Sequence, residues 1–210
     1  MAGSKKQVLY IHGGESFLDR EDFLNRIKTK DIWDLPKSLD EPKSCKWTDT
    51  MAADLGSDYE VFTPTMPNKQ NAKYVEWKIW FERHFEYLND GVILAGCSLG
   101  AMFLGRYLTE EDLPFKTGAV ILMAAALPLD DIDTTDCGDF LIDLEKVSVI
   151  SEKHDKVVIL HSKDDFLVPF SHGEKLAEAL PAAEFITFED KNHFLIEEFP
   201  ELIENIKKLA

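Results

Sequence analysis

Short apolar runs alternate with amphipathic segments along most of the chain, and this alternation limits the fold more than any other feature of the sequence. Apolar runs such as residues 92–95 have the length and composition of buried β-strands. Segments such as residues 72–88 repeat apolar side chains at spacings of three and four, which indicates helices that bury one face. Strands and helices that alternate in this way form a parallel sheet with helices on both faces, so we predict an α/β fold with a mostly parallel sheet of about six strands. The predicted strands are residues 8–11, 59–63, 92–95, 117–126, 156–161 and 184–188, and the predicted helices are residues 47–55, 72–88, 99–108, 171–180 and 196–209.

The length of 210 residues fits one domain, residues 1–210, and two segments interrupt its regular alternation. Residues 16–46 are charged and contain two prolines, so we expect either a flap or a set of short helices there. Residues 127–153 are rich in Asp and carry a small apolar cluster, and we expect an acidic surface excursion beside the functional site. The Asp spacing does not fit the EF-hand calcium loop. Because this segment is short, we expect little or no helical cap and an open site.

The charge balance and the cysteine count exclude several classes of protein. The 39 acidic and 23 basic residues give a net charge of −16, a field that repels phosphate backbones and anionic membranes. No uncharged apolar run reaches the ~20 residues of a membrane helix, and the apolar run after the first two lysines is too short for a signal peptide. The three cysteines are widely spaced and odd in number, which argues against a zinc site and a disulfide framework. We therefore expect a cytoplasmic protein that binds neither nucleic acid nor membranes.

The residues Gly96-Cys97-Ser98-Leu99-Gly100 lie where a predicted strand meets a predicted helix. A serine at the centre of G-x-S-x-G in this context forms a nucleophile elbow, a strained turn that exposes its hydroxyl above the sheet. The glycines two residues before and after the serine leave room where the strand and helix backbones crowd together. In this geometry the side chain of Cys97 turns away, so we expect a buried, inert thiol there. Ser98 is therefore the candidate nucleophile.

A serine nucleophile needs a general base, and the base needs an acid that orients it. We favour His193 as the base because it lies between the last predicted strand and the terminal helix, where a loop reaches over the carboxyl ends of the strands. The acid is expected after the strand at residues 156–161, where Asp164 and Asp165 are adjacent, and spacing alone does not separate them. Three other histidines follow the serine: His154, His161 and His172. We expect His161 and His172 to make local hydrogen bonds.

Together, the elbow, the Asp-x-x-Val-Pro segment of residues 165–169 and the pair His193-Phe194 resemble the α/β-hydrolase superfamily. Residues 160–209 resemble more closely the small serine hydrolases of the retinoblastoma-binding-protein type. In that group the acid of the catalytic triad is the aspartate that directly precedes x-x-(Val/Leu)-Pro, which implies Asp165.

The resemblance also bears on the oxyanion hole, which needs two backbone amides aimed at one oxygen. The amide of Leu99, directly after the serine, is one expected donor. The other is expected from the loop at residues 12–15, after the first strand. The family pattern of His-Gly followed by the donor implies Gly14, with Glu15 as the nearest rival.

The sequence departs from the closer group at three places. Cys97 stands where the group commonly has His, and Lys191-Asn192 stand where it commonly has a pair such as Gly-Gly. Residues 16–46 have no counterpart that we can place. These differences concern the substrate preference more than the triad.

The sequence thus predicts a serine hydrolase that cleaves a carboxylic ester or a related acyl compound through an acyl-enzyme on Ser98, without a metal or an organic cofactor. The expected partner is a small acyl substrate, and the sequence says nothing of the oligomeric state. Two alternatives stay open. One is a catalytically inactive binding protein on the same scaffold, and the other is a thioesterase, amidase or peptidase with the same triad.

Overall fold

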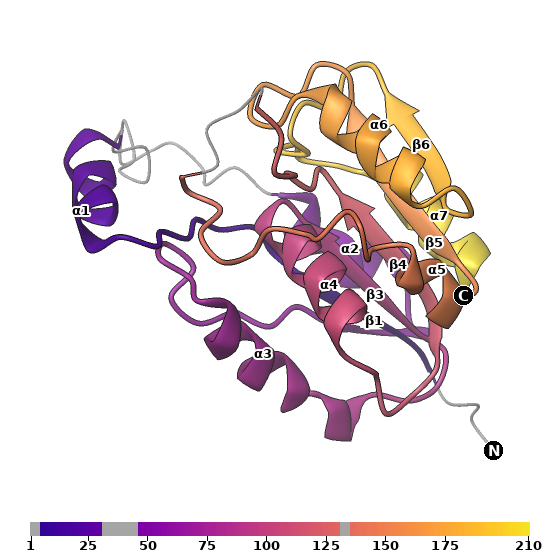
Figure 1. Ribbon diagram of the computed structural model, residues 1–210. Helices are drawn as coiled ribbons and strands as arrows, with labels where there is room; N and C mark the ends of the chain where they lie inside the picture. The colour runs from indigo at the N-terminus through magenta and orange to yellow at the C-terminus, as the bar shows by residue number, and fades with distance from the viewer. Residues whose placement is uncertain (1–4, 31–45, 131–134) are drawn as a thin grey trace, which may run out of the picture.

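The computed structural model describes residues 5–30, 46–130 and 135–210. Its strands form one six-stranded sheet in the order β2-β1-β3-β4-β5-β6, and every neighbouring pair is parallel (Figure 1). The predicted α/β fold with a parallel central sheet is therefore confirmed. The strands are β1 (Lys6–Ile11), β2 (Tyr59–Phe62), β3 (Val92–Cys97), β4 (Thr117–Met123), β5 (Val157–Ser162) and β6 (Glu184–Phe188).

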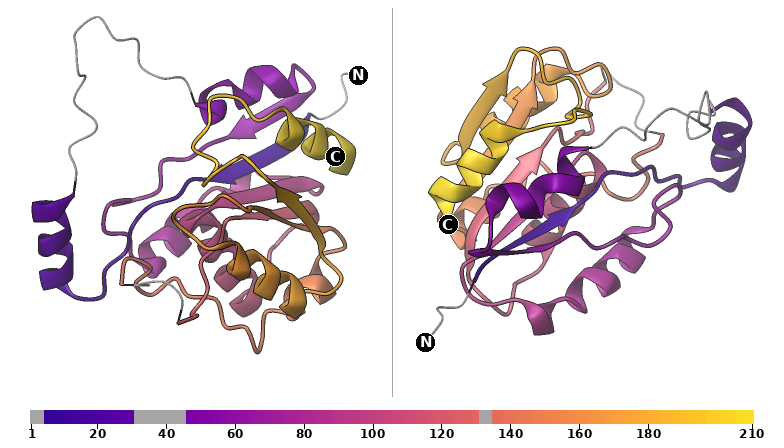
Figure 2. Two further views of the ribbon diagram at one scale, coloured as in Figure 1. Left: turned by 90° about the horizontal axis from the view of Figure 1, so that it is seen from above. Right: turned by 180° about the vertical axis from the view of Figure 1, so that it is seen from behind.

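Helices cover both faces of this sheet (Figure 2). The helices are α1 (Arg20–Thr29), α2 (Trp47–Leu55), α3 (Tyr74–Glu82), α4 (Leu99–Glu110), α5 (Val149–Lys153), α6 (Phe170–Ala179) and α7 (Pro200–Leu209), with a short 3-10 helix η1 (Phe85–Tyr87). In β1, Leu9 and Ile11 pack into one apolar core, whereas Val8 and Tyr10 pack into the other, as the alternation of side chains along a strand requires. The first core is covered by α3, α4, α5 and α6, and the second by α2 and α7. None of the described helices is long and apolar enough to cross a bilayer.

Three predicted elements are shorter than their apolar patterns suggested. The helix predicted at residues 196–209 begins only at Pro200, the first residue of α7. The helix predicted at residues 72–88 ends with α3, and the chain then tightens into η1. This turn brings the ring of Phe85 to 5.2 Å from that of Phe115, measured between centroids. The strand predicted at residues 117–126 ends with β4, because Ala124 has a positive φ of 47° that breaks the extended backbone.

Part of the segment at residues 16–46 is helical, in line with the short-helix alternative. The side chain of Asp19 caps the first turn of α1, and none of the residues in this helix is buried. Figure 1 shows the helix apart from the layers of the sheet. Glu15, in the loop after β1, joins it through an ion pair with Arg26 at 2.5 Å. The flap alternative also concerns residues 31–45, which lie outside the described residues.

The expectation of a surface excursion at residues 127–153 is wrong for its apolar cluster. Phe140 and Ile142 are buried in the core that covers α4. A Cβ on Gly105 of α4 would lie 2.5 Å from Cδ1 of Ile142, so the missing side chain allows this close packing. The ring of Phe140 also packs edge-on against Trp77 of α3, with centroids 5.0 Å apart. The segment is drawn inward because α4 is apolar around most of its circumference and needs cover on its outer side. Two of its acidic residues lie outside the described residues, Asp131 and Asp133.

Candidate active site

Ser98 occupies a sharp turn between the end of β3 and the start of α4. Its φ of 55° and ψ of −123° lie outside the regions that non-glycine residues normally adopt, a strain of roughly 1–3 kcal/mol. The turn is held on both sides: the Ser98 N–H donates to the carbonyl of Met123 at 2.8 Å, and the Ser98 carbonyl accepts from the N–H of Met102 at 3.0 Å. A Cβ placed on Gly13 would lie 3.6 Å from Ser98 Oγ, so the hydroxyl lies against the loop after β1. The candidate nucleophile therefore has the strained geometry that the sequence predicts for it.

The two glycines that flank Ser98 are required by backbone contacts. A Cβ on Gly96 would lie 2.4 Å from the carbonyl oxygen of Gly100, and a Cβ on Gly100 would lie 2.2 Å from the carbonyl oxygen of Ile11. These atoms belong to the backbones of two strands and a helix, which cannot move aside without disturbing the close-packed core. The crowding that the sequence predicts at both positions is confirmed.

A Gly100→Ala substitution is expected to lower the free energy of unfolding by about 2 kcal/mol or more, because its methyl group would overlap a strand carbonyl. Gly105→Ala is the matched control in the same helix. Its methyl group meets the flexible end of Ile142, and alanine favours a helix over glycine by about 1 kcal/mol. Urea unfolding of both variants measures the difference. Equal stability of the two would contradict the steric argument.

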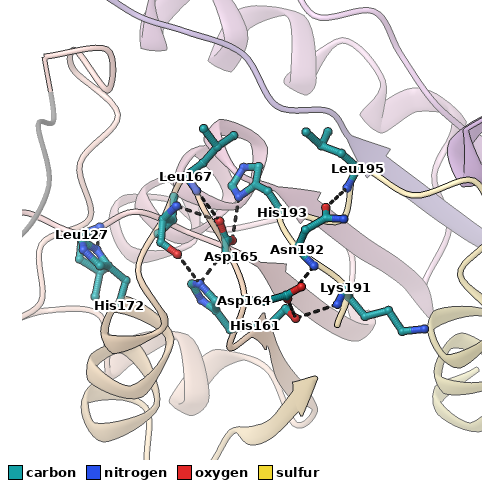
Figure 3. Close-up of polar contacts among 12 residues, drawn as sticks. Leu127, His161, Asp164, Asp165, Leu167, His172, Lys191, Asn192, His193 and Leu195 are labelled. Carbon is teal, nitrogen blue, oxygen red and sulfur yellow. Dashed lines mark hydrogen bonds and ion pairs between the residues drawn. The ribbon is translucent and has the colours of Figure 1, made fainter. Parts of the chain in front are cut away.

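His193 and Asp165 form a buried pair at the carboxyl ends of the strands (Figure 3). Nδ1 of His193 lies 2.8 Å from Oδ2 of Asp165, and the two side chains are 6% and 0% exposed. The other carboxylate oxygen, Oδ1, accepts hydrogen bonds from the backbone N–H groups of Leu167 and Val168, both at 2.9 Å. This fixed carboxylate selects the tautomer of His193 that carries its proton on Nδ1. Nε2 then keeps its lone pair, as a general base requires.

The two adjacent aspartates that spacing did not separate have different partners. Asp164 Oδ1 accepts hydrogen bonds from the backbone N–H of Asn192 at 2.8 Å and from the hydroxyl of Ser162 at 2.5 Å. Asp164 therefore contacts the backbone of the loop that carries His193, whereas Asp165 contacts the imidazole ring (Figure 3).

His161 makes the predicted local hydrogen bond. It also lies against the carboxylate of Asp165, a contact that we did not predict. Its Nε2 donates to the carbonyl of Val168 at 2.9 Å and lies 3.5 Å from Oδ2 of Asp165. Figure 3 shows the rings of His161 and His193 on opposite sides of this carboxylate. Burial lowers the pKa of His161, which favours its neutral form. The sequence does place His161 at the end of the strand that leads to Asp165, and this position could have indicated the contact. The hydrogen bond of His172 is not local, since its Nδ1 accepts from the N–H of Leu127, 45 residues earlier in the chain, at 2.9 Å.

The buried histidines predict a loss of stability in weak acid. Burial lowers the pKa of His12, His154 and His161, so the unfolded chain takes up their protons more readily. Their stabilising contribution is fully present above about pH 6.5, the pKa of a histidine in the unfolded chain, and is lost as the pH falls below this value toward their lower folded-state pKa values. Urea unfolding at several pH values measures this slope. His154→Asn keeps an acceptor near the Thr117 hydroxyl, now 2.9 Å from His154 Nδ1, and is expected to reduce the slope. A slope of zero in the wild type would refute the prediction.

Backbone amides beside Ser98 are the candidate oxyanion donors. The N–H groups of Leu99 and Gly14 donate to no acceptor within the part of the chain that the structure describes. A Cβ on Gly14 would lie 3.3 Å from Cδ2 of Leu99, so the two donor segments are adjacent. The N–H of Glu15 donates to the carbonyl of Lys69 at 2.9 Å and is therefore not available to a ligand. Of the two rivals in this loop, only Gly14 has a free amide.

His12 holds this loop in place, a role that the sequence analysis did not assign. Its Nε2 accepts a hydrogen bond from the N–H of Met66 at 2.9 Å, and Nδ1 lies 2.7 Å from the carbonyl oxygen of Gly13. Because the Met66 amide only donates, the ring proton resides on Nδ1 and is donated to Gly13. Burial lowers the pKa of His12 and favours this neutral ring. Holding the Gly13 carbonyl fixes the peptide plane that carries the Gly14 N–H.

Cys97 is buried behind the elbow, where its thiol contacts the hydroxyl of Tyr10. Burial, aided by the charge of Asp165, raises its pKa to about 12, so the thiol stays protonated at neutral pH. This agrees with the inert thiol predicted for the position. Within residues 5–30, 46–130 and 135–210, no group of three His, Cys, Asp or Glu side chains is placed to hold a metal ion.

Comparison with known proteins identifies a relative and a fold. No protein-family model matches the chain. The chain is 32% identical over 137 residues to the "Putative hydrolase YdeN" of Bacillus subtilis (strain 168), an alignment that covers 63% of this chain and 69% of that protein. The solved structure of the B. subtilis ydeN gene product superposes with a TM-score of 0.72 at 21% identity, over 98% of both chains.

Two further solved structures share the fold at lower identity. The meta-cleavage product hydrolase CumD of Pseudomonas fluorescens IP01 has a TM-score of 0.66 at 14% identity and covers 99% of this chain and 91% of its own. The esterase domain of a Rhodothermus marinus protein has a TM-score of 0.57 at 16% identity, and the superposition covers 100% of this chain and 88% of that domain. The specific likeness to the retinoblastoma-binding-protein type stays a prediction. The sequence identity to YdeN and the fold shared with its solved structure show that this chain belongs to the α/β-hydrolase superfamily.

Proposed function

We propose that the protein is a serine hydrolase that cleaves a carboxylic ester or a related acyl compound through an acyl-enzyme on Ser98. The observation that carries the proposal is the contact of 2.8 Å between Nδ1 of His193 and Oδ2 of the buried Asp165, which lies at the same end of the parallel sheet as the strained turn of Ser98. A serine, a carboxylate and an imidazole that follow one another in this order along the chain form the apparatus of acyl transfer on this fold.

In the proposed reaction, Nε2 of His193 accepts the proton of Ser98 Oγ as this oxygen attacks the acyl carbon. The negative oxygen of the tetrahedral intermediate accepts hydrogen bonds from the N–H groups of Leu99 and Gly14. His193 then protonates the leaving alcohol, and Asp165 stabilises the imidazolium while it exists. Water then takes the place of the alcohol: it gives a proton to Nε2 of His193 and attacks the acyl carbon, the bond from this carbon to Ser98 Oγ breaks, the carboxylic acid leaves, and the proton returns to Oγ.

The rim of the site supports a substrate with an apolar group. Phe166 and Leu167 follow the acid directly, Leu195 follows the base at the second position, and all three are exposed, at 68%, 53% and 62%. Figure 3 shows Leu167 and Leu195 on either side of His193. Exposed apolar side chains that gather at a reactive group commonly bind ligands. We therefore propose an ester with an apolar acyl or alkyl group. The name of the Rhodothermus marinus structural neighbour, an esterase domain, fits this class.

A fluorophosphonate probe tests the proposal, because an activated serine attacks its phosphorus, displaces fluoride and becomes phosphonylated. We expect one adduct per folded chain, and peptide mapping by mass spectrometry to place it on Ser98. Protein unfolded in urea is the control, because it has the same serines without the triad geometry. A folded protein without an adduct, or with an adduct on another serine, would overturn the proposal.

A further inference from the structure

We infer that Asp164 is a positioning residue, which holds the loop that carries His193 so that the imidazole meets Ser98 and Asp165. This inference rests on the proposed function and deepens it. The two neighbouring aspartates then have separate tasks: Asp165 orients the imidazole ring, and Asp164 orients the backbone from which this ring projects.

The loop around His193 has an unfavourable backbone that needs such support. Asn192 and Phe194, the residues on both sides of His193, have positive φ values of 42° and 56°. Asparagine tolerates this region, but for a bulky aromatic residue it costs about 1–2 kcal/mol. A loop with two such residues does not keep its shape through local preference alone, so contacts from outside the loop decide where His193 lies.

Hydrogen bonds from the end of β5 and from the turn that follows it meet the backbone just before His193. Asp164 Oδ1 accepts the N–H of Asn192 at 2.8 Å. The hydroxyl of Ser162 donates to the same oxygen at 2.5 Å and accepts the N–H of Lys191 at 2.9 Å. Two successive amides of the loop are thus tied to the end of β5, the strand that leads into Asp165 (Figure 3).

The tie to Asp164 is a charge-assisted hydrogen bond. The hydroxyl of Ser162 and the amide of Asn192 both donate to the carboxylate, and they lower its pKa because they favour the charged form. Hydrogen bonds to an ionised acceptor are shorter and roughly twice as strong as neutral ones. The other side of the loop is held separately, since Nε1 of Trp47 donates to the carbonyl of Phe194 at 2.9 Å. Loss of Asp164 is therefore expected to release one side of the loop without unfolding the protein.

Asp164→Ala is expected to lower kcat for an ester by about 10- to 100-fold with a KM within about twofold of the wild type, because misplacement of a catalytic group by about 1 Å has effects of this size. Asp164→Asn keeps an oxygen that accepts the Asn192 amide, so we expect it to restore kcat to within a few-fold of the wild type. Asp190→Ala is the matched control, since it removes an exposed carboxylate two positions before Asn192, and this carboxylate has no hydrogen bond among the described residues. We expect it to leave kcat unchanged.

The low-field proton signal of His193 Nδ1–H in the NMR spectrum is a second readout that does not require turnover. We expect this signal in the wild type, in Asp164→Asn and in Asp190→Ala, and we expect it to broaden or disappear in Asp164→Ala. This readout separates the inference from the proposed function. If the wild type does not turn over an ester but its Nδ1–H signal still depends on Asp164, the proposed function fails and the positioning role stands.

Several results would overturn the inference: a wild-type kcat and a sharp Nδ1–H signal in Asp164→Ala, an equal loss of kcat in Asp190→Ala, or no recovery in Asp164→Asn. If Asp164→Ala does not fold, Ser162→Ala takes its place, because it removes the neighbouring tie to the Lys191 amide. We expect it to reduce kcat at unchanged KM, and an unchanged kcat would overturn the inference.

Discussion

Ser98→Ala is expected to lower kcat for any ester that the wild type hydrolyses by about 10⁴-fold or more, because no other group at this position can form the acyl-enzyme. The variant is expected to fold with nearly the stability of the wild type. Alanine and serine carry the same Cβ, so the positive φ of 55° strains both equally, and the hydroxyl makes no hydrogen bond within the described residues. Steady-state kinetics measures kcat, and urea unfolding checks the fold.

Cys97→Ala is the comparison that separates the two nucleophilic side chains of the elbow. The Cys97 thiol is buried and protonated, so its removal is expected to leave most of the activity and all of the fluorophosphonate labelling. If Ser98→Ala kept its activity while Cys97→Ala lost it, the serine mechanism would be wrong.

Asp165→Asn is expected to lower kcat by about 10⁴-fold, the effect of the wrong imidazole tautomer in serine hydrolases. The amide oxygen of the new asparagine would accept the N–H groups of Leu167 and Val168, which now bind Oδ1. Its NH₂ group would then face Nδ1 of His193, which lies 2.8 Å from Oδ2 in the wild type. Because an NH₂ group only donates, the imidazole would carry its proton on Nε2 and could not accept the proton of Ser98.

Asp164→Asn is the matched control for this substitution, because it makes the same chemical change one residue earlier. Its carboxylate accepts an amide and a hydroxyl, and a carboxamide oxygen serves both, so kcat is expected to stay within a few-fold of the wild type. Steady-state kinetics of both variants with one ester decides between the two aspartates. A large loss in Asp164→Asn with a small loss in Asp165→Asn would reverse the assignment.

The elbow could be predicted from sequence because what it requires is local. Two glycines, a serine and the change from an apolar strand to a helix occupy a short stretch of chain, and the crowding at Gly96 comes from Gly100 in the same stretch. The crowding at Gly100 comes from the carbonyl of Ile11 on β1, a contact that only the fold shows. The strands could be predicted for a similar reason, since a buried parallel strand is a short run of apolar residues. The segment at residues 127–153 could not, because its Asp residues suggested solvent while the need to cover α4 was visible only in three dimensions.

By itself, the sequence determined the fold class, the position of the elbow and the chain order of serine, aspartate and histidine, because periodicity and steric demands act between near neighbours. It also favoured Asp165 over Asp164, but only through a family resemblance. The tertiary structure alone decided which of the two carboxylates reaches the ring of His193, and it showed two contacts that we did not predict, that of His12 with Met66 and that of His161 with Asp165. The physical reason is that these contacts join segments far apart in the chain. Which residues make these contacts depends on the shape of the turns that carry them. In such a turn adjacent side chains, such as those of Asp164 and Asp165, point in different directions.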